Sequence, residues 1–248
     1  MGNSTLNQTA KCTPEDAFAV KGAAAWHYVE AGSRELLFGA NFWDGADTDT
    51  SSPVFELVMG GSATNLVQMV PTRGARQWTS FASGNMTYAC VANARGNSVC
   101  YPLHNVGSNN STNTSNNSTN TGPVISMGYE FMGPAVGVVH FEWRNGGHYV
   151  AFAAEAGVEI WTLHDSVNTP FVLHSTVPIT TCNDGAGIGG LAFFNDDDGQ
   201  SYIAVTCTSG PSPLLASPPG GAPTFSITDN PLTTVSNALL SEMTLLNS

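Results

Sequence analysis

The chain is poor in charged residues, and basic residues are the scarcest of them. Only 10% of its 248 residues are charged, with 7 Lys and Arg against 19 Asp and Glu, which gives a formal net charge of −12. So few cations cannot neutralise a run of phosphate groups, and we therefore expect no nucleic-acid partner. The same scarcity excludes a basic patch that would hold the chain on an anionic membrane surface.

Long apolar runs are also missing. No stretch approaches the ~20 apolar residues that a membrane-spanning helix needs, so we expect no membrane insertion. The first five residues, Met1 to Thr5, are polar and no apolar core follows them, so no signal peptide is visible.

Cysteine and asparagine usage nevertheless favours an extracellular or cell-surface location. Five cysteines in a chain rich in Asn-x-Ser/Thr sequons are typical of an oxidising compartment. A tract of Asn, Ser and Thr generates sequons by chance, but Asn85 lies outside that tract, in an expected hairpin turn where a glycan would project into solvent. The sequons that could carry N-linked glycans begin at Asn3, Asn7, Asn85, Asn109, Asn110, Asn113, Asn116 and Asn117.

The cysteine spacing predicts two disulfides. Cys90 and Cys100 are symmetric about Arg95, so a hairpin centred there places them opposite each other, within the ~5.5 Å Cα separation that a bridge needs. Cys182 and Cys207 then form the second pair. Cys12 is left over, either unpaired or bonded to another chain.

An internal repeat is the main signal for the fold. Four apolar strands recur at intervals of roughly 50 to 60 residues, the spacing of four-stranded propeller blades. The repeated strands are Leu37 to Asn41, Tyr88 to Asn93, Tyr149 to Ala154 and Tyr202 to Cys207. We predict an all-β, propeller-like array of about four four-stranded antiparallel blades.

The domain boundaries follow from this repeat. Residues 1–20 are an N-terminal arm, 21–231 the repeat domain and 232–248 a tail or the start of a further blade. Within the domain the repeats cover about 22–71, 72–132, 133–180 and 181–231. The run 107–122 cannot bury apolar area, and we expect it to be a disordered loop. In the last repeat, no third strand is evident in the Pro-rich segment Gly210 to Pro223.

One repeat resembles a known family. Pro71-Thr72-Arg73-Gly74-Ala75-Arg76-Gln77-Trp78, followed by Val91-Ala92-Asn93, is similar to the EAR (EPTP) repeat over about residues 22–103, and the similarity is weaker over 136–210. The resemblance implies a seven-bladed propeller in a secreted or surface protein, used for protein–protein recognition. Only about four repeats are present here, so three alternatives are open: the chain is a fragment of a longer protein, another subunit supplies the missing blades and completes the ring, or the fold is an open array.

An open arc of blades leaves apolar faces and unpaired strand edges in water, which predicts assembly. We expect the partners to be copies of this chain or another extracellular protein. The N-terminal arm or the tail Thr234 to Leu246 is expected to pack against the neighbouring subunit.

Candidate metal ligands are few. The acidic loop at Asp44, Asp47 and Asp49 offers oxygen ligands of the kind that Ca²⁺ prefers, but it lacks the full calcium-loop pattern. The run Asn195 to Gly199 is explained as a hairpin turn. We expect no cofactor and no resident metal, with Ca²⁺ at the first loop as the open alternative.

The six histidines, namely His27, His104, His140, His148, His164 and His174, show no zinc-type spacing on one element. The five tryptophans are interpreted as blade packing. Glu142, Glu155 and Glu159 could supply a carboxylate pair for glycoside hydrolysis, but no nucleophile elbow or phosphate loop is present.

Our main interpretation is therefore an extracellular, glycosylated structural or interaction protein, such as a fibre, coat or adhesion subunit, and not an enzyme. The alternative is a carbohydrate-active propeller enzyme that uses loop carboxylates.

Overall fold

The computed structural model describes residues 22–57 except 33, 64–103, 125, 128–131, 133–164 except 156, 170–182 and 187–228. Within these ranges all regular secondary structure is β-strand, and none of the described residues forms a helix able to cross a membrane. The predicted arm, tail and Asn/Ser/Thr loop lie outside the described residues, as do Cys12, His104 and every sequon except Asn85.

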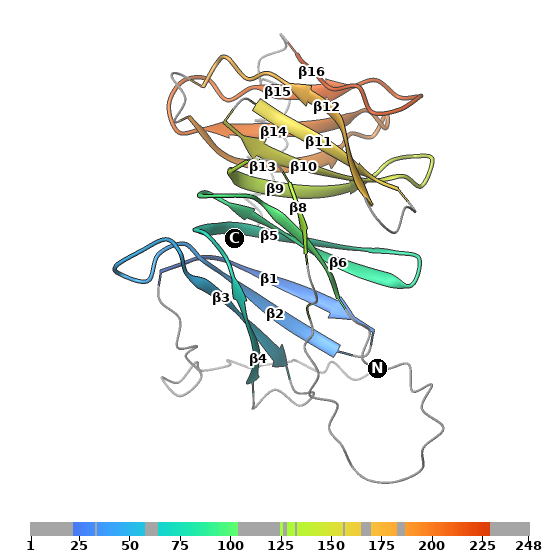
Figure 1. The fold of residues 1–248 in the computed structure, drawn as a ribbon. Coiled ribbons are helices and arrows are strands. Elements are labelled where there is room, and N and C mark those ends of the chain that lie inside the picture. The colour runs from blue at the N-terminus through green and yellow to red at the C-terminus, as the bar shows by residue number, and fades with distance from the viewer. Residues whose placement is uncertain are drawn as a thin grey trace, which may run out of the picture.

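The strands form four antiparallel sheets of four strands, each in simple sequential order (Figure 1). Blade 1 contains β1 (Ala23–Ala31), β2 (Arg34–Asn41), β3 (Ser51–Leu57) and β4 (Thr64–Pro71). Blade 2 contains β5 (Ala75–Ser83), β6 (Met86–Asn93), β7 (Val99–Leu103) and β8 (Tyr129–Glu130).

The second half of the chain repeats the order. Blade 3 contains β9 (Ala135–Glu142), β10 (His148–Ala154), β11 (Gly157–Leu163) and β12 (Phe171–Val177). Blade 4 contains β13 (Ile188–Asn195), β14 (Ser201–Cys207), β15 (Leu214–Ser217) and β16 (Ser226–Ile227). The all-β prediction of four four-stranded antiparallel blades is confirmed. The Pro-rich segment does contain a third strand, β15, whose Leu214 and Leu215 are buried against its neighbours.

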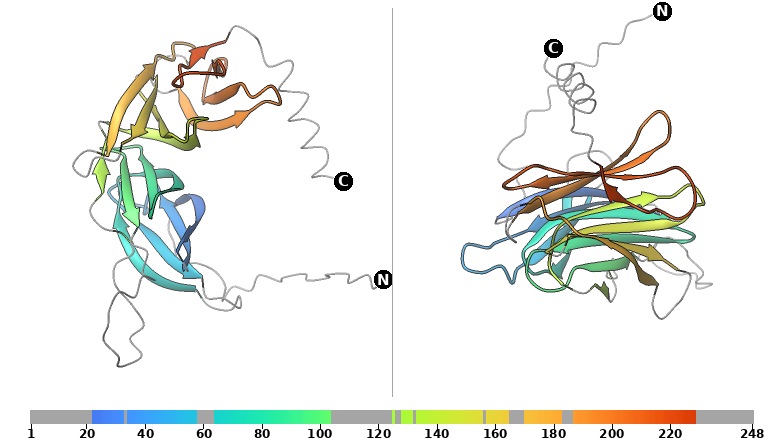
Figure 2. Two further views of the ribbon diagram at one scale, coloured as in Figure 1. Left: turned by 90° about the vertical axis from the view of Figure 1, so that its right-hand side faces the viewer. Right: turned by 90° about the horizontal axis from the view of Figure 1, so that it is seen from above.

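The four blades stand side by side in an open arc, with blades 1 and 4 at its two ends (Figure 2). The first strand of each blade lines the concave side, and these inner strands contact one another in succession. Their approach is close: a Cβ built on Gly137 of β9 would lie 3.0 Å from the Cα of Gly190 in β13. We call the face of a blade that looks toward the preceding blade its leading face, and the opposite face its trailing face.

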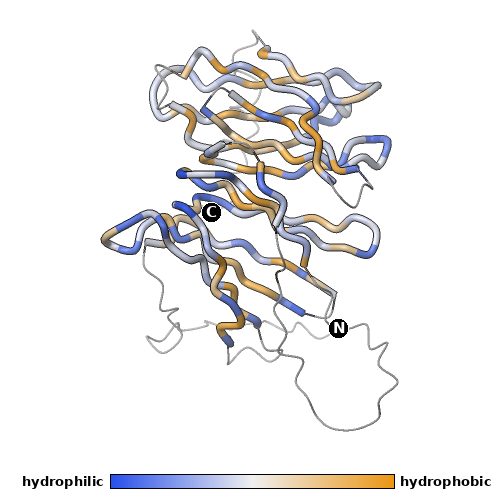
Figure 3. The backbone as a smooth tube through the Cα atoms, viewed as in Figure 1, coloured by the Kyte–Doolittle hydropathy of each residue, from blue (hydrophilic) through white to orange (hydrophobic). Residues whose placement is uncertain are grey.

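Apolar residues recur along the strands (Figure 3), and their side chains pack in three clusters between successive blades. One core lies between blades 1 and 2 and includes Phe38 and Trp78. A second, between blades 2 and 3, includes Phe81 and Phe152. A third lies between blades 3 and 4, around Phe141. Burial of these side chains between sheets is the main source of stability.

A polar corner recurs at the end of the second strand in blades 1 and 2. The Asn41 side chain donates to the carbonyl of Ser51 at 2.8 Å, and the Asn93 side chain donates to the carbonyl of Asn97 at 2.8 Å. Both asparagines are buried. Their amides satisfy backbone groups that would otherwise be buried without partners, which explains why the strand ends in Asn in both repeats.

Candidate functional site

A polar hollow lies between blades 1 and 2, with a volume of about 650 Å³. Its walls are the end of the loop before β3, the turn from β4 to β5, the connection between β6 and β7, and β8. The residues that give it its chemistry are Asp49, Arg73, Asn93, Asn97, Tyr101 and Glu130. We call this feature the polar hollow.

Hydrogen bonds between these segments fix its walls. The amide of Thr72 donates to the carbonyl of Thr50 at 2.8 Å, which joins the first loop to the turn. The amide of Arg95 donates to the carbonyl of Arg73 at 2.9 Å, which joins the turn to the β6–β7 connection. A site held by paired backbone groups keeps its side chains in place before a ligand arrives.

One wall carries an ion pair. The Arg73 Nε lies 3.8 Å from an Asp49 carboxylate oxygen, and both side chains are about two-thirds exposed. The Arg73 side chain runs across Gly96, where a Cβ would lie only 2.7 Å from the Arg73 Cδ. Gly96 also has φ +84°, a conformation that favours glycine. The position of Arg73 therefore depends on a glycine on the opposite segment.

The other wall carries the second carboxylate. The Asn97 side-chain amide donates to Glu130 at 2.9 Å. Tyr101 lies at the bottom and is buried, and burial, followed by the charge of Glu130, raises its pKa to about 12. The phenol therefore stays protonated at any physiological pH. The hollow thus combines two carboxylates, a guanidinium, amides and a phenol, which together can bind a ligand rich in hydroxyl groups.

The acidic loop predicted as a calcium alternative is organised differently from a metal site. An Asp44 carboxylate oxygen accepts hydrogen bonds from the amides of Ala46 and Asp47, both at 2.8 Å. An Asp47 oxygen accepts one from the amide of Thr48 at 2.6 Å. These bonds are those of Asx turns. Among the described residues, no group of three or more His, Cys, Asp or Glu side chains is arranged to hold a metal ion.

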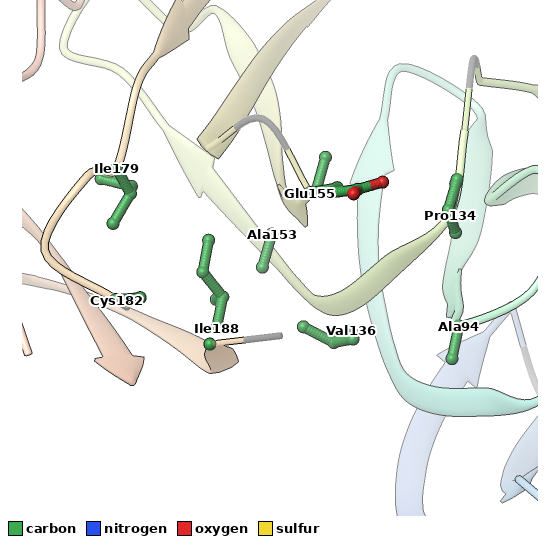
Figure 4. Close-up of a pocket in the computed structure, with 10 residues that line it drawn as sticks. Ala94, Pro134, Val136, Ala153, Glu155, Ile179, Cys182 and Ile188 are labelled. Atoms are coloured by element: carbon green, nitrogen blue, oxygen red, sulfur yellow. The ribbon is translucent and has the colours of Figure 1, made fainter. Parts of the chain in front are cut away.

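The three glutamates proposed as hydrolytic carboxylates do not meet. Glu142 ends β9. Glu159 accepts a hydrogen bond from the Trp161 indole at 3.2 Å. Glu155 lies at a separate, mostly apolar hollow of about 230 Å³ near the starts of β9 and β13 (Figure 4), where its carboxylate is directed toward Pro134. Carboxylates do share two hollows: Asp49 and Glu130 line the polar hollow, and Glu142 lines another with Asp197 and Asp198.

The turn at Asn195 to Gly199 has the structural role that was predicted. The Asp196 carboxylate accepts from the amide of Gln200 at 2.7 Å and from the Tyr202 hydroxyl at 3.0 Å. Asp197 and Asp198 are exposed beyond it and line, with Glu142, a third hollow of about 560 Å³.

A histidine pair escaped the sequence analysis. The His140 Nε2 lies 3.1 Å from the His148 Nδ1, and the His140 ring stacks on Phe81 of blade 2 at 4.3 Å. Burial, and then the neighbouring His148, lowers the pKa of His140 to about 4. The register of the β9–β10 hairpin could have revealed this pair. His27 bonds the Ser80 hydroxyl at 2.9 Å, and burial lowers its pKa.

The structure contains the disulfides Cys90–Cys100 and Cys182–Cys207, the two pairs that were predicted. Cys90 and Cys100 are directly opposed in the β6–β7 register, as the symmetric spacing requires. Asn85 is exposed in the turn between β5 and β6.

Comparisons with known proteins found similarity to solved structures alone. No family model and no curated protein matches the chain. Solved structures resemble it at low identity. A GH43_1 enzyme from Xanthomonas citri, solved with xylose, shares 13% identity and a TM-score of 0.48 over 84% of this chain and 73% of its own. An endo-1,4-beta-xylanase from Bacteroides thetaiotaomicron shares 13% identity with a TM-score of 0.45, and the match covers 83% of this chain and 74% of the xylanase. An alpha-L-arabinofuranosidase from Lactobacillus brevis shares 14% identity with a TM-score of 0.45, and the match covers 81% of this chain and 73% of the arabinofuranosidase.

These comparisons correct two expectations. The assignment to the EAR repeat family is wrong, because no family model matches and the similar solved structures are glycoside hydrolases. The residues that suggested it have general propeller roles: Gly74 makes the turn between blades with φ +67°, and Trp78 packs between sheets. The expectation that the chain is not an enzyme is contradicted by the same structures, which are enzymes that act on glycosides.

Proposed function

We propose that the protein is a carbohydrate-active propeller enzyme whose site is the polar hollow between blades 1 and 2. The observation that carries this proposal is that two carboxylates, Asp49 and Glu130, which come from different blades, line one hollow together with Arg73 and Tyr101. Glycoside hydrolysis needs two carboxyl groups on either side of the scissile bond. The surrounding amides supply hydrogen-bond donors suited to sugar hydroxyls, and the Tyr101 phenol oxygen, which donates its proton to the Pro71 carbonyl at 3.5 Å, can accept from one.

The two carboxyl groups have different neighbours, and this suggests different roles. Asp49 lies beside the Arg73 cation, which suits it to carry the negative charge that stabilises a developing oxocarbenium ion. Glu130, held by the Asn97 amide, would give its proton to the departing glycosidic oxygen. In this scheme the Glu130 carboxyl group gives its proton to the glycosidic oxygen as the C–O bond breaks, water adds to the anomeric carbon of the oxocarbenium ion, and the proton that this water loses returns to Glu130.

The experiment measures release of reducing sugar from xylo- and arabino-oligosaccharides, the substrate classes named for the structural neighbours. Glu130→Gln should lower the rate by about 10²- to 10⁴-fold, the usual contribution of general acid catalysis. Asp49→Asn should have an effect of similar size. Glu155→Gln is the matched control, since it removes an exposed carboxylate from a different hollow and should leave the rate unchanged. If the wild-type chain neither binds nor cleaves these glycans, the proposal is wrong.

Gly96→Ala sharpens this test without removing a functional group. The added Cβ would displace the Arg73 side chain from its course across the hollow. We expect weaker glycan binding with the carboxylates intact. An unchanged affinity would show that Arg73 takes no part.

An extracellular location with N-linked glycans stays part of the proposal, and the two disulfides support it. An intact-protein mass from the native source would show the glycan at Asn85. A second candidate function, assembly through protein–protein contacts, is favoured by a different observation, the exposed apolar leading face of blade 1.

A further inference from the structure

Asn93 makes one hydrogen bond that the repeat explains and another that it does not. Asn41 and Asn93 end the second strands of blades 1 and 2, and each pairs in register with the first residue of the inner strand, Ala23 or Ala75. Each side-chain amide donates to a backbone carbonyl close to the start of the third strand, at 2.8 Å in both blades. This shared bond closes the polar corner of the blade.

The second bond belongs to Asn93 alone of the two. The Asn93 Oδ1 accepts the backbone amide of Arg73 at 3.3 Å, and Arg73 lies in the turn from β4 to β5. The Asn41 Oδ1 is buried and accepts a hydrogen bond from no described residue. A side-chain amide can join two backbone segments in this way because one end accepts and the other donates. Asn93 therefore links blade 2 to the turn that leaves blade 1.

The two segments that Asn93 links hold the two carboxylates of the polar hollow. On one side, the Arg73 Nε lies 3.8 Å from an Asp49 oxygen. On the other side, Asn97, whose carbonyl accepts from Asn93, donates its own side-chain amide to Glu130 at 2.9 Å. One buried amide thus connects the partner of Asp49 with the partner of Glu130.

The Asn97 side chain has a fixed orientation. Its Oδ1 accepts the backbone amide of Gly133 at 3.3 Å, so its Nδ2 is the end that faces Glu130. The backbone on the other side of the link is held as well, because the amide of Asn93 donates to the Ser98 hydroxyl at 3.3 Å. Asn93 is only 2% exposed, and hydrogen bonds away from water are electrostatically stronger.

We propose that Asn93 is a positioning residue that sets the distance between the Asp49 and Glu130 carboxyl groups. This inference rests on the proposed function, in which the two groups act on one glycosidic bond. Their separation must suit the reacting atoms, and a misplacement of about 1 Å can lower a rate about 10²-fold. Asn93 acts through Arg73 on one carboxylate and through Asn97 on the other.

The first test is the kinetics of Asn93→Ala on the oligosaccharides that the wild-type chain cleaves. The variant loses both links and should lower kcat by about 10- to 10²-fold. KM should stay close to that of the wild type, because the side chains of Asp49, Arg73 and Glu130 are all still present; a loss in kcat alone marks an interaction made in the transition state. Circular dichroism checks the fold, and Asn93→Ser, which keeps a small polar group, is the second variant.

Gln68→Ala is the matched control. The Gln68 side-chain amide also joins blades 1 and 2, since it donates to the carbonyl of Ile125 at 3.4 Å and accepts from the amide of Ile125 at 3.1 Å. Ile125 pairs with Leu103 of blade 2, and Gln68 is not among the residues that line the polar hollow. Gln68→Ala should leave kcat unchanged. An equal loss of kcat in Gln68→Ala and Asn93→Ala would overturn the proposal, because the effect would then belong to the interface as a whole.

A double-mutant cycle tests the route to Glu130. Asn97→Ala removes the amide that bonds Glu130 but keeps the backbone carbonyl that accepts from Asn93. If Asn93 acts through Asn97, the double variant should lose less activity than the product of the two single losses. Losses that multiply fully would show that the two residues act independently, and the proposal would be wrong.

Hydrogen exchange gives a readout that needs no glycan. The Arg73 backbone amide should exchange about tenfold faster in Asn93→Ala, the effect of losing one hydrogen bond, and at the wild-type rate in Gln68→Ala. Unchanged exchange at Arg73 in Asn93→Ala would overturn the positioning role. The two possible failures are distinct: a wild-type chain that cleaves no glycan contradicts the proposed function and this inference with it, whereas an active wild type with an equally active Asn93→Ala contradicts this inference alone.

Discussion

Trp26 and Trp78 occupy the same place in successive blades, and the difference between them separates two kinds of surface. Trp78 is enclosed between two sheets, with Phe38 on one side, Tyr101 on the other and a hydrogen bond to the backbone of blade 1. Trp26 lies over Gly39 of its own sheet, with its ring 6.2 Å from that of Phe55, and is 40% exposed. The same position of the repeat is thus buried in blade 2, inside the arc, and partly exposed in blade 1.

The comparison shows that a residue's position in the repeat determines which face of the sheet it lies on, but not whether its side chain is buried. A tryptophan on a leading face is suited to pack on the trailing face of another sheet, whichever chain supplies it. Blade 1 keeps its four strands and its register although none of the other described sheets packs on its leading face. Cover from a second sheet adds stability through burial of apolar area.

The largest effect is expected from removing the enclosed member of the pair. Trp78→Ala should lower the free energy of unfolding by about 4 kcal/mol, because it leaves a cavity between blades 1 and 2 and an unpaired carbonyl at Gly39. Urea denaturation followed by circular dichroism measures this change. Trp43→Ala, which truncates an exposed tryptophan, is the control and should change stability by less than about 0.5 kcal/mol. A loss below 1 kcal/mol for Trp78→Ala would mean that this interface contributes little.

The next interface along the arc is secured by a covalent bond as well as by packing. Cys90 and Cys100 are fully buried between blades 2 and 3 and close a short loop across neighbouring strands. The double variant Cys90→Ala/Cys100→Ala should lower the free energy of unfolding by roughly 3 kcal/mol. The same denaturation experiment measures it, with reduction of the wild-type protein as a parallel. If the double variant were as stable as the wild type, the bond would add nothing beyond packing.

Both interfaces hold a histidine whose pKa burial lowers, His27 between blades 1 and 2 and His140 between blades 2 and 3, and the larger response to acid is expected from His140. Because the pKa of His140 falls to about 4 in the folded protein, the unfolded chain binds the proton more tightly. The free energy of unfolding should then be fully retained above pH 6.5 and should decrease by about 3 kcal/mol as the pH falls from 6.5 to 4.

Thermal unfolding across this pH range tests the expectation. His140→Phe, which keeps the aromatic stack on Phe81, should flatten the profile. His174→Gln should not, because that ring bonds only the carbonyl of Pro223 at the outer side of the blade. A wild-type profile that is flat between pH 4 and 6.5 would contradict the lowered pKa of His140.

Much of this fold could be predicted from the sequence, because its strand pairing is local. Strands that follow one another in the chain pair with one another, so the repeat of apolar strands and the symmetric spacing of Cys90 and Cys100 were sufficient. Strand β15 was missed because its two leucines stand among prolines and glycines that suppress the strand pattern.

The candidate site could not be predicted in the same way. Asp49 belongs to a loop of blade 1 and Glu130 to the last strand of blade 2, so only the packing of two blades brings them to one hollow. The sequence analysis did single out Asp49, but for calcium, and it favoured Glu142, Glu155 and Glu159 as carboxylates. Neighbours in the sequence say little about which side chains converge across an interface, and no repeat register links Asp49 with Glu130.

The smallest effect on stability is expected at Trp26, the more exposed of the two tryptophans. Its size tells how well the leading face of blade 1 is covered. Trp26→Ala should lower the free energy of unfolding of the monomeric chain by less than about 1 kcal/mol, because a partly exposed ring leaves no closed cavity behind. The measurement is urea denaturation at a concentration where light scattering shows monomers, with Trp78→Ala beside it. A loss close to that of Trp78→Ala would show that a segment outside the described residues already covers this face. A small loss together with weaker self-association would instead assign Trp26 to contact between chains.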